Sequence, residues 1–169
     1  MKDYLDLPSI KEGMPGMHRD LASHYYSACM TTLHRSGHKD WDFLHLDGNS
    51  KRDIPIHWDD YFDDEIDRSW KEINYCTDHA AVCISCVLAI HETDYTIIER
   101  SCKGDGFDYW MGYKDDILFN RVARLEISGI LKEATTNTIE KRLNIKRNKP
   151  NNRIAVVYQH IYQLLNLAN

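Results

Sequence analysis

The residues best suited to chemistry are carboxylates on short predicted strands in the middle of the chain. Asp108 follows a glycine-rich turn, and Glu126 lies in the next predicted strand, 122–128. A hairpin around that turn would pair Asp108 with Ser101 and bring Glu99 diagonally across on the same face. Carboxylate oxygens are natural ligands for Mg²⁺, which binds one or two acids together with water and substrate phosphate. Asp108 and Glu126, with Glu99 as an optional third ligand, are therefore a candidate site for Mg²⁺ or Mn²⁺.

The strand 122–128 indicates how Glu126 would be presented. Apolar residues alternate along it with mostly polar ones, namely Ala123, Leu125 and Ile127 against Arg124, Glu126 and Ser128. Successive side chains of a strand point to opposite faces, so one face is predicted to join the core and the other to present chemistry or a binding surface. A purely structural alternative is that Glu126 pairs with Arg124 or Arg100 while Asp108 caps the turn, although exposed pairs contribute only ~0–1 kcal/mol.

The order of elements gives these acids a context. The predicted elements are a helix at 63–92, strands at 95–102, 107–112 and 122–128, a helix at 137–147 and a strand at 154–158. This order, with Asp108 on the second strand and Glu126-Ile127-Ser128 on the third, resembles the core of the PD-(D/E)xK nuclease superfamily over residues 63–161. The resemblance implies an α/β fold with a restriction-endonuclease-like core, a mixed sheet of four or more strands flanked by helices. It also implies metal-dependent cleavage of nucleic acid, with DNA favoured over RNA.

The chain departs from the superfamily at one position, because Ser128 replaces the lysine of the motif. In the superfamily that lysine would polarise or deprotonate the attacking water. Lys132 and Lys103 are the nearest substitutes, and Lys132 completes the predicted catalytic set with Asp108 and Glu126. Without a substitute, the protein would be a catalytically inactive nuclease-like subunit that binds a partner protein or nucleic acid.

A second resemblance concerns the whole central stretch. The chain is similar to small uncharacterised bacterial proteins that carry segments of the form IERSxKGxGFDYWxG and ARLExSGI. These resemblances imply a setting in bacterial defence, and no activity is carried over from the uncharacterised proteins.

Charge is distributed unevenly along the chain. The net charge of −5 excludes a uniformly basic nucleic-acid binder, yet 59–67 carries six acids in nine residues and 141–153 carries six bases in thirteen. Such asymmetry can guide a polyanion to one side of a domain. We expect nucleic-acid contacts from Arg124 and from the basic helix, through Lys141, Arg142, Lys146 and Arg147. The alternative is that both runs are solvated helix faces, or that the acidic run contacts a partner.

Cysteine usage and hydropathy bear on the compartment. An odd number of cysteines, five, in apolar surroundings and without a signal peptide predicts reduced thiols and a cytoplasmic location. The pair Cys83 and Cys86 lies inside an apolar helix, which favours two buried thiols over a redox or zinc site. The longest apolar run, 80–90, is too short to span a bilayer, so no membrane is expected.

The chain length and the positions of proline and glycine predict the domain organisation. With 169 residues, one domain is expected. Residues 1–17 lack periodicity and contain Pro8, Gly13, Pro15 and Gly16, which predicts an N-terminal arm followed by a single nuclease-like domain at 18–169. Helical spacing predicts a helix at 19–35, and alternation predicts strands at 41–46 and 54–58.

Overall fold

The computed structural model describes residues 2–47, 51–132, 134–138, 140–141 and 156–158. The elements, in chain order, are β1 (Leu5–Asp6), the 3₁₀ helix η1 (Leu7–Glu12), α1 (Arg19–Arg35), β2 (Phe43–Asp47), β3 (Lys51–His57), α2 (Asp64–Ser69), α3 (Ile73–Glu92), β4 (Tyr95–Arg100), β5 (Tyr109–Tyr113), β6 (Ala123–Glu126) and β7 (Val156–Tyr158). The fold combines helices with strands, so the predicted α/β class is confirmed.

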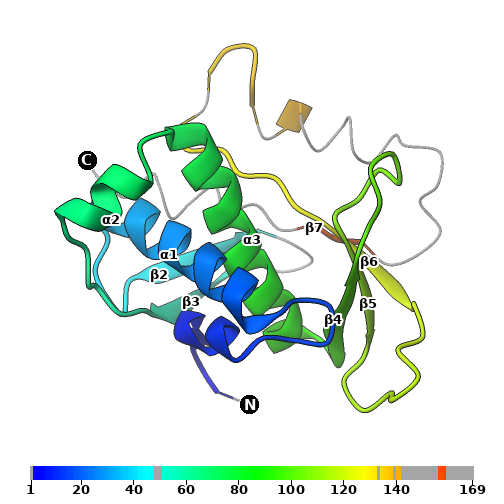
Figure 1. The fold of residues 1–169 in the computed structure, drawn as a ribbon. Coiled ribbons are helices and arrows are strands. Elements are labelled where there is room, and N and C mark those ends of the chain that lie inside the picture. Colours follow the sequence, from blue (N-terminus) through cyan, green and yellow to red (C-terminus); the bar gives the residue numbers. More distant parts are fainter. Residues whose placement is uncertain (1, 48–50, 133, 139, 142–155, 159–169) are drawn as a thin grey trace.

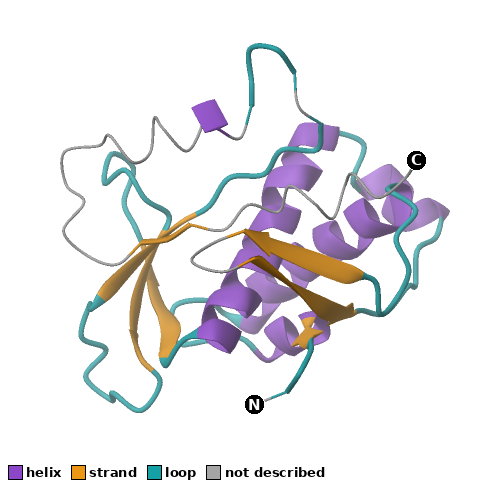
Figure 2. Ribbon diagram, turned by 180° about the vertical axis from the view of Figure 1, so that it is seen from behind, coloured by secondary structure: helices purple, strands orange, loops and turns teal. Residues whose placement is uncertain are grey.

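The strands form two separate sheets around a helical layer. Figures 1 and 2 show α1 and α3 side by side, with one sheet on a face of this helix pair and the other beside α3. The first sheet has the order β1-β3-β2, with β1 parallel and β2 antiparallel to β3. The second has the order β4-β5-β6-β7, in which β4, β5 and β6 are antiparallel neighbours and β7 runs parallel to β6. The first sheet is an addition to the single sheet that the sequence predicted.

The N-terminal segment is part of the core, and the prediction of an arm at 1–17 is wrong. Leu5, Leu7, Ile10 and Met17 are fully buried in the main hydrophobic cluster. The backbone N–H of Gly16 also donates to the Ile97 carbonyl oxygen at 2.9 Å, so the segment lies against the edge strand β4. The strand β1 and the 3₁₀ helix η1 are too short for their buried apolar residues to form a periodic pattern, which is why the sequence did not reveal them.

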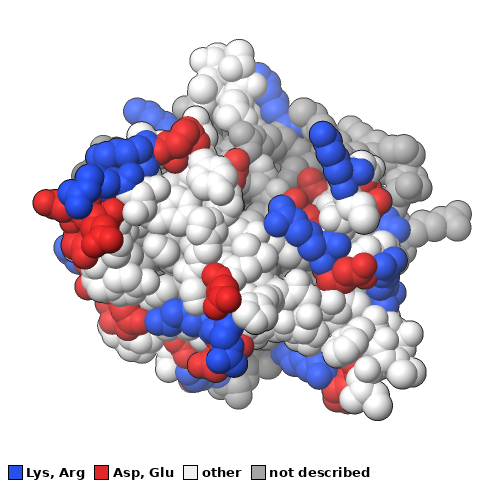
Figure 3. Space-filling view, in the orientation of Figure 1, with Lys and Arg blue, Asp and Glu red and all other residues white. Residues whose placement is uncertain are grey.

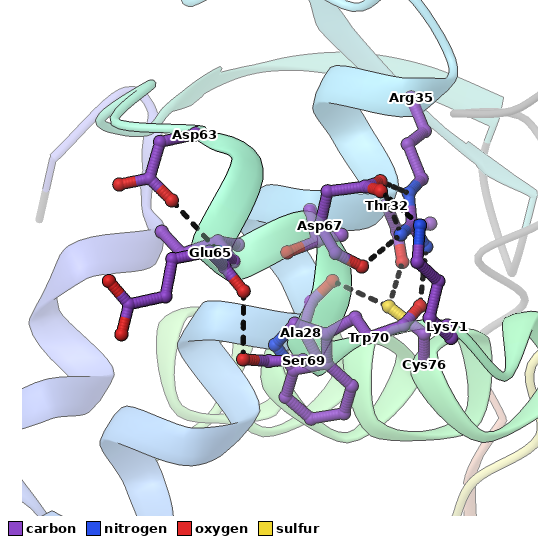
Figure 4. Close-up of polar contacts among 12 residues, drawn as sticks. Ala28, Thr32, Arg35, Asp63, Glu65, Asp67, Ser69, Trp70, Lys71 and Cys76 are labelled. Atoms are coloured by element: carbon purple, nitrogen blue, oxygen red, sulfur yellow. Dashed lines mark hydrogen bonds and ion pairs between the residues drawn. The ribbon is translucent and has the colours of Figure 1, made fainter.

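The predicted helix at 19–35 is confirmed, whereas the predicted single helix at 63–92 divides into α2 and α3. Arg35, at the end of α1, binds the C-terminal end of α2 (Figure 4). Its guanidinium donates to the main-chain oxygens of Trp70 at 2.7 Å and Asp67 at 3.0 Å and to the Asp67 carboxylate at 2.7 Å, which satisfies the carbonyls at the end of α2. The Glu72 carboxylate then accepts from the first backbone N–H groups of α3 and starts a new helix.

Helix α3 is the central helix of the core. Cys83 and Cys86 are buried free thiols, as predicted, and burial raises the pKa of both. Among the described residues, α3 alone is long and apolar enough to cross a membrane by length and composition, with a mean hydropathy of 1.4. Because 61% of its most apolar 18-residue stretch is buried inside the fold, the place of α3 as a core helix accounts for that composition.

Candidate functional site

A polar cavity lies at the end of the second sheet where β4 ends, β5 begins and β6 ends. Its volume is about 410 Å³, and it is lined by Arg100, Ser101, Cys102, Lys103, Gly104, Gly106, Phe107, Asp108 and Glu126. The register pairs Tyr109 with Leu125, so the next positions along the two strands, Asp108 and Glu126, stand opposite each other. Two of the predicted site residues therefore share one cavity.

Asp108 is held from both neighbouring strands. Its backbone N–H donates to the Leu125 carbonyl oxygen and its own carbonyl accepts from the Ser101 N–H, both at 2.9 Å. Its side chain is anchored too, since Oδ2 accepts from the backbone N–H of Ile127 at 2.6 Å. The carboxylate is thus fixed at the end of β6 beside Glu126. The carboxylate of Asp108 also lies close enough to the core helix to contribute, after burial itself, to the raised pKa of the Cys86 thiol.

Two carboxylates at directly opposed positions repel each other unless positive charge lies nearby. Arg100 and Lys103 line the same cavity and supply such charge. Arg100 is oriented by the helical layer, because its Nη1 donates to the Tyr25 hydroxyl of α1 at 3.2 Å and its guanidinium lies 5.9 Å from the ring centroid of Tyr109. The cavity therefore joins an acidic wall from β5 and β6 to a basic wall from β4 and the turn.

The turn that carries Lys103 is the predicted glycine turn. Gly104 and Gly106 have φ values of +105° and +84°, a region that side chains rarely adopt. The Asp105 carboxylate closes the turn by accepting from the Cys102 N–H at 2.9 Å. Lys103 is consequently presented from a conformationally restricted turn at the rim of the cavity.

The second candidate lysine, Lys132, is exposed and is not among the residues that line the cavity. The path of the chain explains this. Gly129 packs so closely on the first turns of α3 that an added Cβ would lie 2.8 Å from the Thr77 carbonyl oxygen and 3.1 Å from the Ala81 Cβ. After β6 the backbone follows α3 (Figure 1), and Lys132 comes three residues beyond this contact.

Glu99, the optional third metal ligand, is bound by Arg121 and not directed into the cavity. It pairs with Trp110 in the sheet, and its carboxylate accepts from Arg121 Nε at 2.7 Å and Nη2 at 2.5 Å. It does not line the cavity. The loop residue Arg121 was not anticipated from the sequence, and no local pattern connects it to Glu99.

Arginine and aromatic side chains cover the outer face of the sheet next to the cavity. The Arg124 guanidinium lies 5.0 Å from the ring centroid of Phe107 and 4.9 Å from that of Trp110, and Arg121 lies 5.1 Å from Trp110. A guanidinium can stack on an aromatic ring through its face and still form hydrogen bonds through its edge, which is the geometry that proteins use to bind carboxylates and phosphates. Arg124, predicted as a nucleic-acid contact, is therefore beside the cavity.

The predicted basic helix lies mostly outside the described residues. Of its four predicted contacts, Lys141 is described, and its ammonium donates to the Thr135 carbonyl oxygen at 2.7 Å. Arg142, Lys146 and Arg147 lie outside the described residues.

The donor set fits Mg²⁺ or Mn²⁺ better than a softer metal. Among the described residues, no group of three or more His, Cys, Asp or Glu side chains could hold a metal ion. Two carboxylates alone nevertheless match the way proteins bind Mg²⁺, which keeps several waters and takes one or two acids. Asp108 and Glu126 have the chemistry that such an ion would need, whereas Glu99 is bound by Arg121 and does not line the cavity.

Comparisons with protein-family models, with curated proteins and with solved structures found no match for this chain.

Proposed function

We propose that this chain is a metal-dependent nuclease-like protein that acts on nucleic acid, with DNA as the expected substrate. The observation that carries the proposal is that Asp108 and Glu126, from opposed positions on neighbouring strands, line one polar cavity together with two basic residues.

The arrangement of elements supports the finer assignment to a restriction-endonuclease-like core. A helix, α3, precedes three antiparallel strands, and the strand β7 then runs parallel to β6. The acids fall just before β5 and at the end of β6, which agrees with the second and third core strands of the PD-(D/E)xK pattern.

The chemistry of the cavity suits hydrolysis of a phosphodiester. A bound Mg²⁺ or Mn²⁺ would lower the pKa of a coordinated water and offset the charge of the reacting phosphate. Asp108 and Glu126 would hold the ion, and the Ile127 N–H fixes the orientation of Asp108. Arg100, steered by Tyr25, would bind a phosphate oxygen through its N–H groups.

Lys103 replaces Lys132 in our assignment of the residue that orients or deprotonates the attacking water. Lys132 is nearer to Ser128 in the sequence, but of the two lysines only Lys103 lines the cavity. The loss of a general base reduces a rate by about 10²–10⁴-fold. Lys103→Ala should therefore abolish most of the activity, whereas Lys132→Ala serves as the matched control and should leave it nearly unchanged.

The experiment is cleavage of plasmid and single-stranded DNA by the purified chain, with Mg²⁺, Mn²⁺ or EDTA. Cleavage should require metal and should be lost in Asp108→Asn and in Glu126→Gln. Glu12→Gln, which changes an exposed acid on η1 that does not line the cavity, is the control for loss of a carboxylate. Cleavage that survives both Asp108→Asn and Glu126→Gln would exclude this site.

The inactive alternative predicts a different result from the same proteins. Metal and DNA would still bind, but no product would form. Binding of DNA, measured in Ca²⁺ so that turnover does not interfere, should weaken steeply with added salt. It should also weaken in Arg124→Ala and in Lys141→Ala without a change in sequence preference. If neither metal nor DNA binds, both forms of the proposal fail.

A further inference from the structure

The loop between β5 and β6 exposes three consecutive large apolar side chains. Ile117 is 86% exposed, Leu118 77% and Phe119 51%. The loop projects from the lower right of the fold in Figure 1, and Figure 3 shows mostly uncharged surface at that place. Single exposed apolar residues are ordinary, but a contiguous group of this kind marks an interaction site.

The loop is held in one conformation by Asp116. The Asp116 carboxylate accepts from the backbone N–H of Leu118 at 2.9 Å, and from the backbone and side-chain nitrogens of Asn120 at 3.0 and 2.9 Å. These hydrogen bonds lower the pKa of Asp116, so its carboxylate stays ionised and bonded. Phe119 adopts a φ of +52°, which points the chain back toward β6.

The base of the loop is anchored as well. The Lys114 ammonium donates to the carbonyl oxygens of Ile90 and Thr93, both at 2.6 Å, at the end of α3. On the other side Asn120 lies against Gly112, where an added Cβ would be 2.7 Å from the Asn120 carbonyl oxygen. A loop fastened at both ends and across its middle presents its apolar tip without the entropic cost of ordering it on binding.

We propose that the tip Ile117-Leu118-Phe119 is an anchor that inserts into an apolar pocket, rimmed by basic side chains, on a partner protein. This inference is independent of the proposed nuclease-like function, because the loop and the cavity lie at opposite ends of the second sheet.

Charge around the tip identifies the kind of partner. Asp94 and Asp115 are exposed on or beside the loop, and the loop also carries the ionised Asp116. Of the two nearby cations, Arg121 is paired with Glu99, and Lys114 keeps its charge while it donates to main-chain carbonyls, so carboxylates outnumber the remaining cation. Within the described part of the chain, the Asp115 carboxylate has no ion pair. The surface is thus apolar with an acidic border, which is complementary to a basic rim.

The same charges argue against the other occupants. An anionic membrane surface would repel the two carboxylates that flank the tip. A second copy of this chain, with a net charge of −5, would bring identical acidic borders together in a two-fold interface. The three side chains also expose on the order of 400 Å², about half of what each partner contributes to a standard interface. They therefore serve as the centre of a larger contact with a different protein.

The test begins with a photoreactive benzoylphenylalanine at position 118, in the full chain, in its native host cells. The same probe at Ile73, which is 54% exposed on α3, is the matched control. We expect one discrete protein adduct at position 118 that is absent at position 73. An adduct with another copy of the chain, an adduct with lipid alone, or no discrete adduct would overturn the proposal.

The captured protein is then purified and its affinity measured directly. Leu118→Asp should weaken binding at least about 30-fold, as removal of a buried anchor does, while Ile73→Asp leaves it unchanged. Asp116→Ala keeps all three apolar side chains but releases the loop, and it should weaken binding about tenfold because the ordering cost is restored. Binding that is unchanged by Leu118→Asp would overturn the proposal, even if capture succeeded. Circular dichroism and the melting temperature check that each variant is folded.

Discussion

Replacing Gly16 with alanine tests how firmly the N-terminal segment belongs to the fold. An added Cβ would lie 2.3 Å from both the Glu99 nitrogen and the Ile98 carbonyl carbon, closer than real Cβ atoms approach other atoms. The obstructing atoms are backbone, so no side-chain rotation relieves the clash. The segment would have to withdraw by roughly 1 Å to reach ordinary contact distance.

The cost of Gly16→Ala follows from what that withdrawal disturbs. It would break the hydrogen bond from the Gly16 N–H to the Ile97 carbonyl and displace the buried Met17. Overpacking contributes about 1–3 kcal/mol and a lost hydrogen bond about 0.5–1.5 kcal/mol. We expect the free energy of unfolding to fall by about 2–4 kcal/mol and the melting temperature by about 5–15 °C.

Urea denaturation and thermal unfolding, both followed by circular dichroism, measure this effect. Glu12→Ala, an exposed change in the same segment, is the control and should shift the free energy of unfolding by less than about 0.5 kcal/mol. Truncating the Ile98 side chain should not rescue Gly16→Ala, because its backbone is what obstructs. If Gly16→Ala unfolds at the same temperature and urea concentration as the unmodified chain, the packing of 13–17 on β4 is refuted.

Three further predictions concern the thiols, the acidic run and the core. Cys102 is the one exposed thiol of the five, so a thiol reagent should modify one cysteine in the folded protein and all five after denaturation. Modification of a second thiol in the folded state would contradict the burial of α1 or α3. Lys71 and then Arg35 lower the pKa of Asp67 to about 2. The ionised carboxylate therefore stabilises the folded state above its ordinary pKa of 3.8, and this stabilisation is lost as the pH falls through 2. Lys71→Ala should raise the pKa of Asp67 in a carboxyl-carbon NMR titration, and an unchanged pKa would exclude the ion pair. Trp70 is buried where α2 meets α3, so Trp70→Ala should lower the free energy of unfolding by about 3–5 kcal/mol. Trp41 is half-exposed, so Trp41→Ala should lower it far less. Equal urea midpoints for the two variants would contradict this packing.

Elements with a clear period were predictable from the sequence, and the ends of the strands were predicted less closely than those of the first helix. The helix Arg19–Arg35 was predicted with its observed bounds because apolar residues recur at helical spacing among polar and small ones. The strands β4, β5 and β6 were found within one or two residues because glycine turns and alternation mark them. The strand β7 (Val156–Tyr158) lies within the apolar run 154–158 that predicted a strand.

Features that depend on distant side chains were missed. The end of α2 is bound by Arg35, about thirty residues away, and no local pattern in 63–92 indicates that contact. The burial of the N-terminus requires the edge of β4 as a partner. At the site, Asp108 and Glu126 could be paired by strand order alone, but the choice between Lys103 and Lys132 could not. It depends on the close contact between Gly129 and α3, which directs the chain away from the cavity.

The length of β5 determines the distance between the cavity and the apolar loop. Its five residues, Tyr109–Tyr113, separate the cavity at one end from the apolar loop at the other. A strand rises about 3.3 Å per residue, so the two lie roughly 17 Å apart along the strand, close to the axial length of about five base pairs of duplex DNA. A protein held at the loop would therefore share a local volume with any nucleic acid held at the cavity. If that partner protein also binds nucleic acid, its contacts would act at a high effective concentration, and even weak contacts would suffice to retain the nucleic acid.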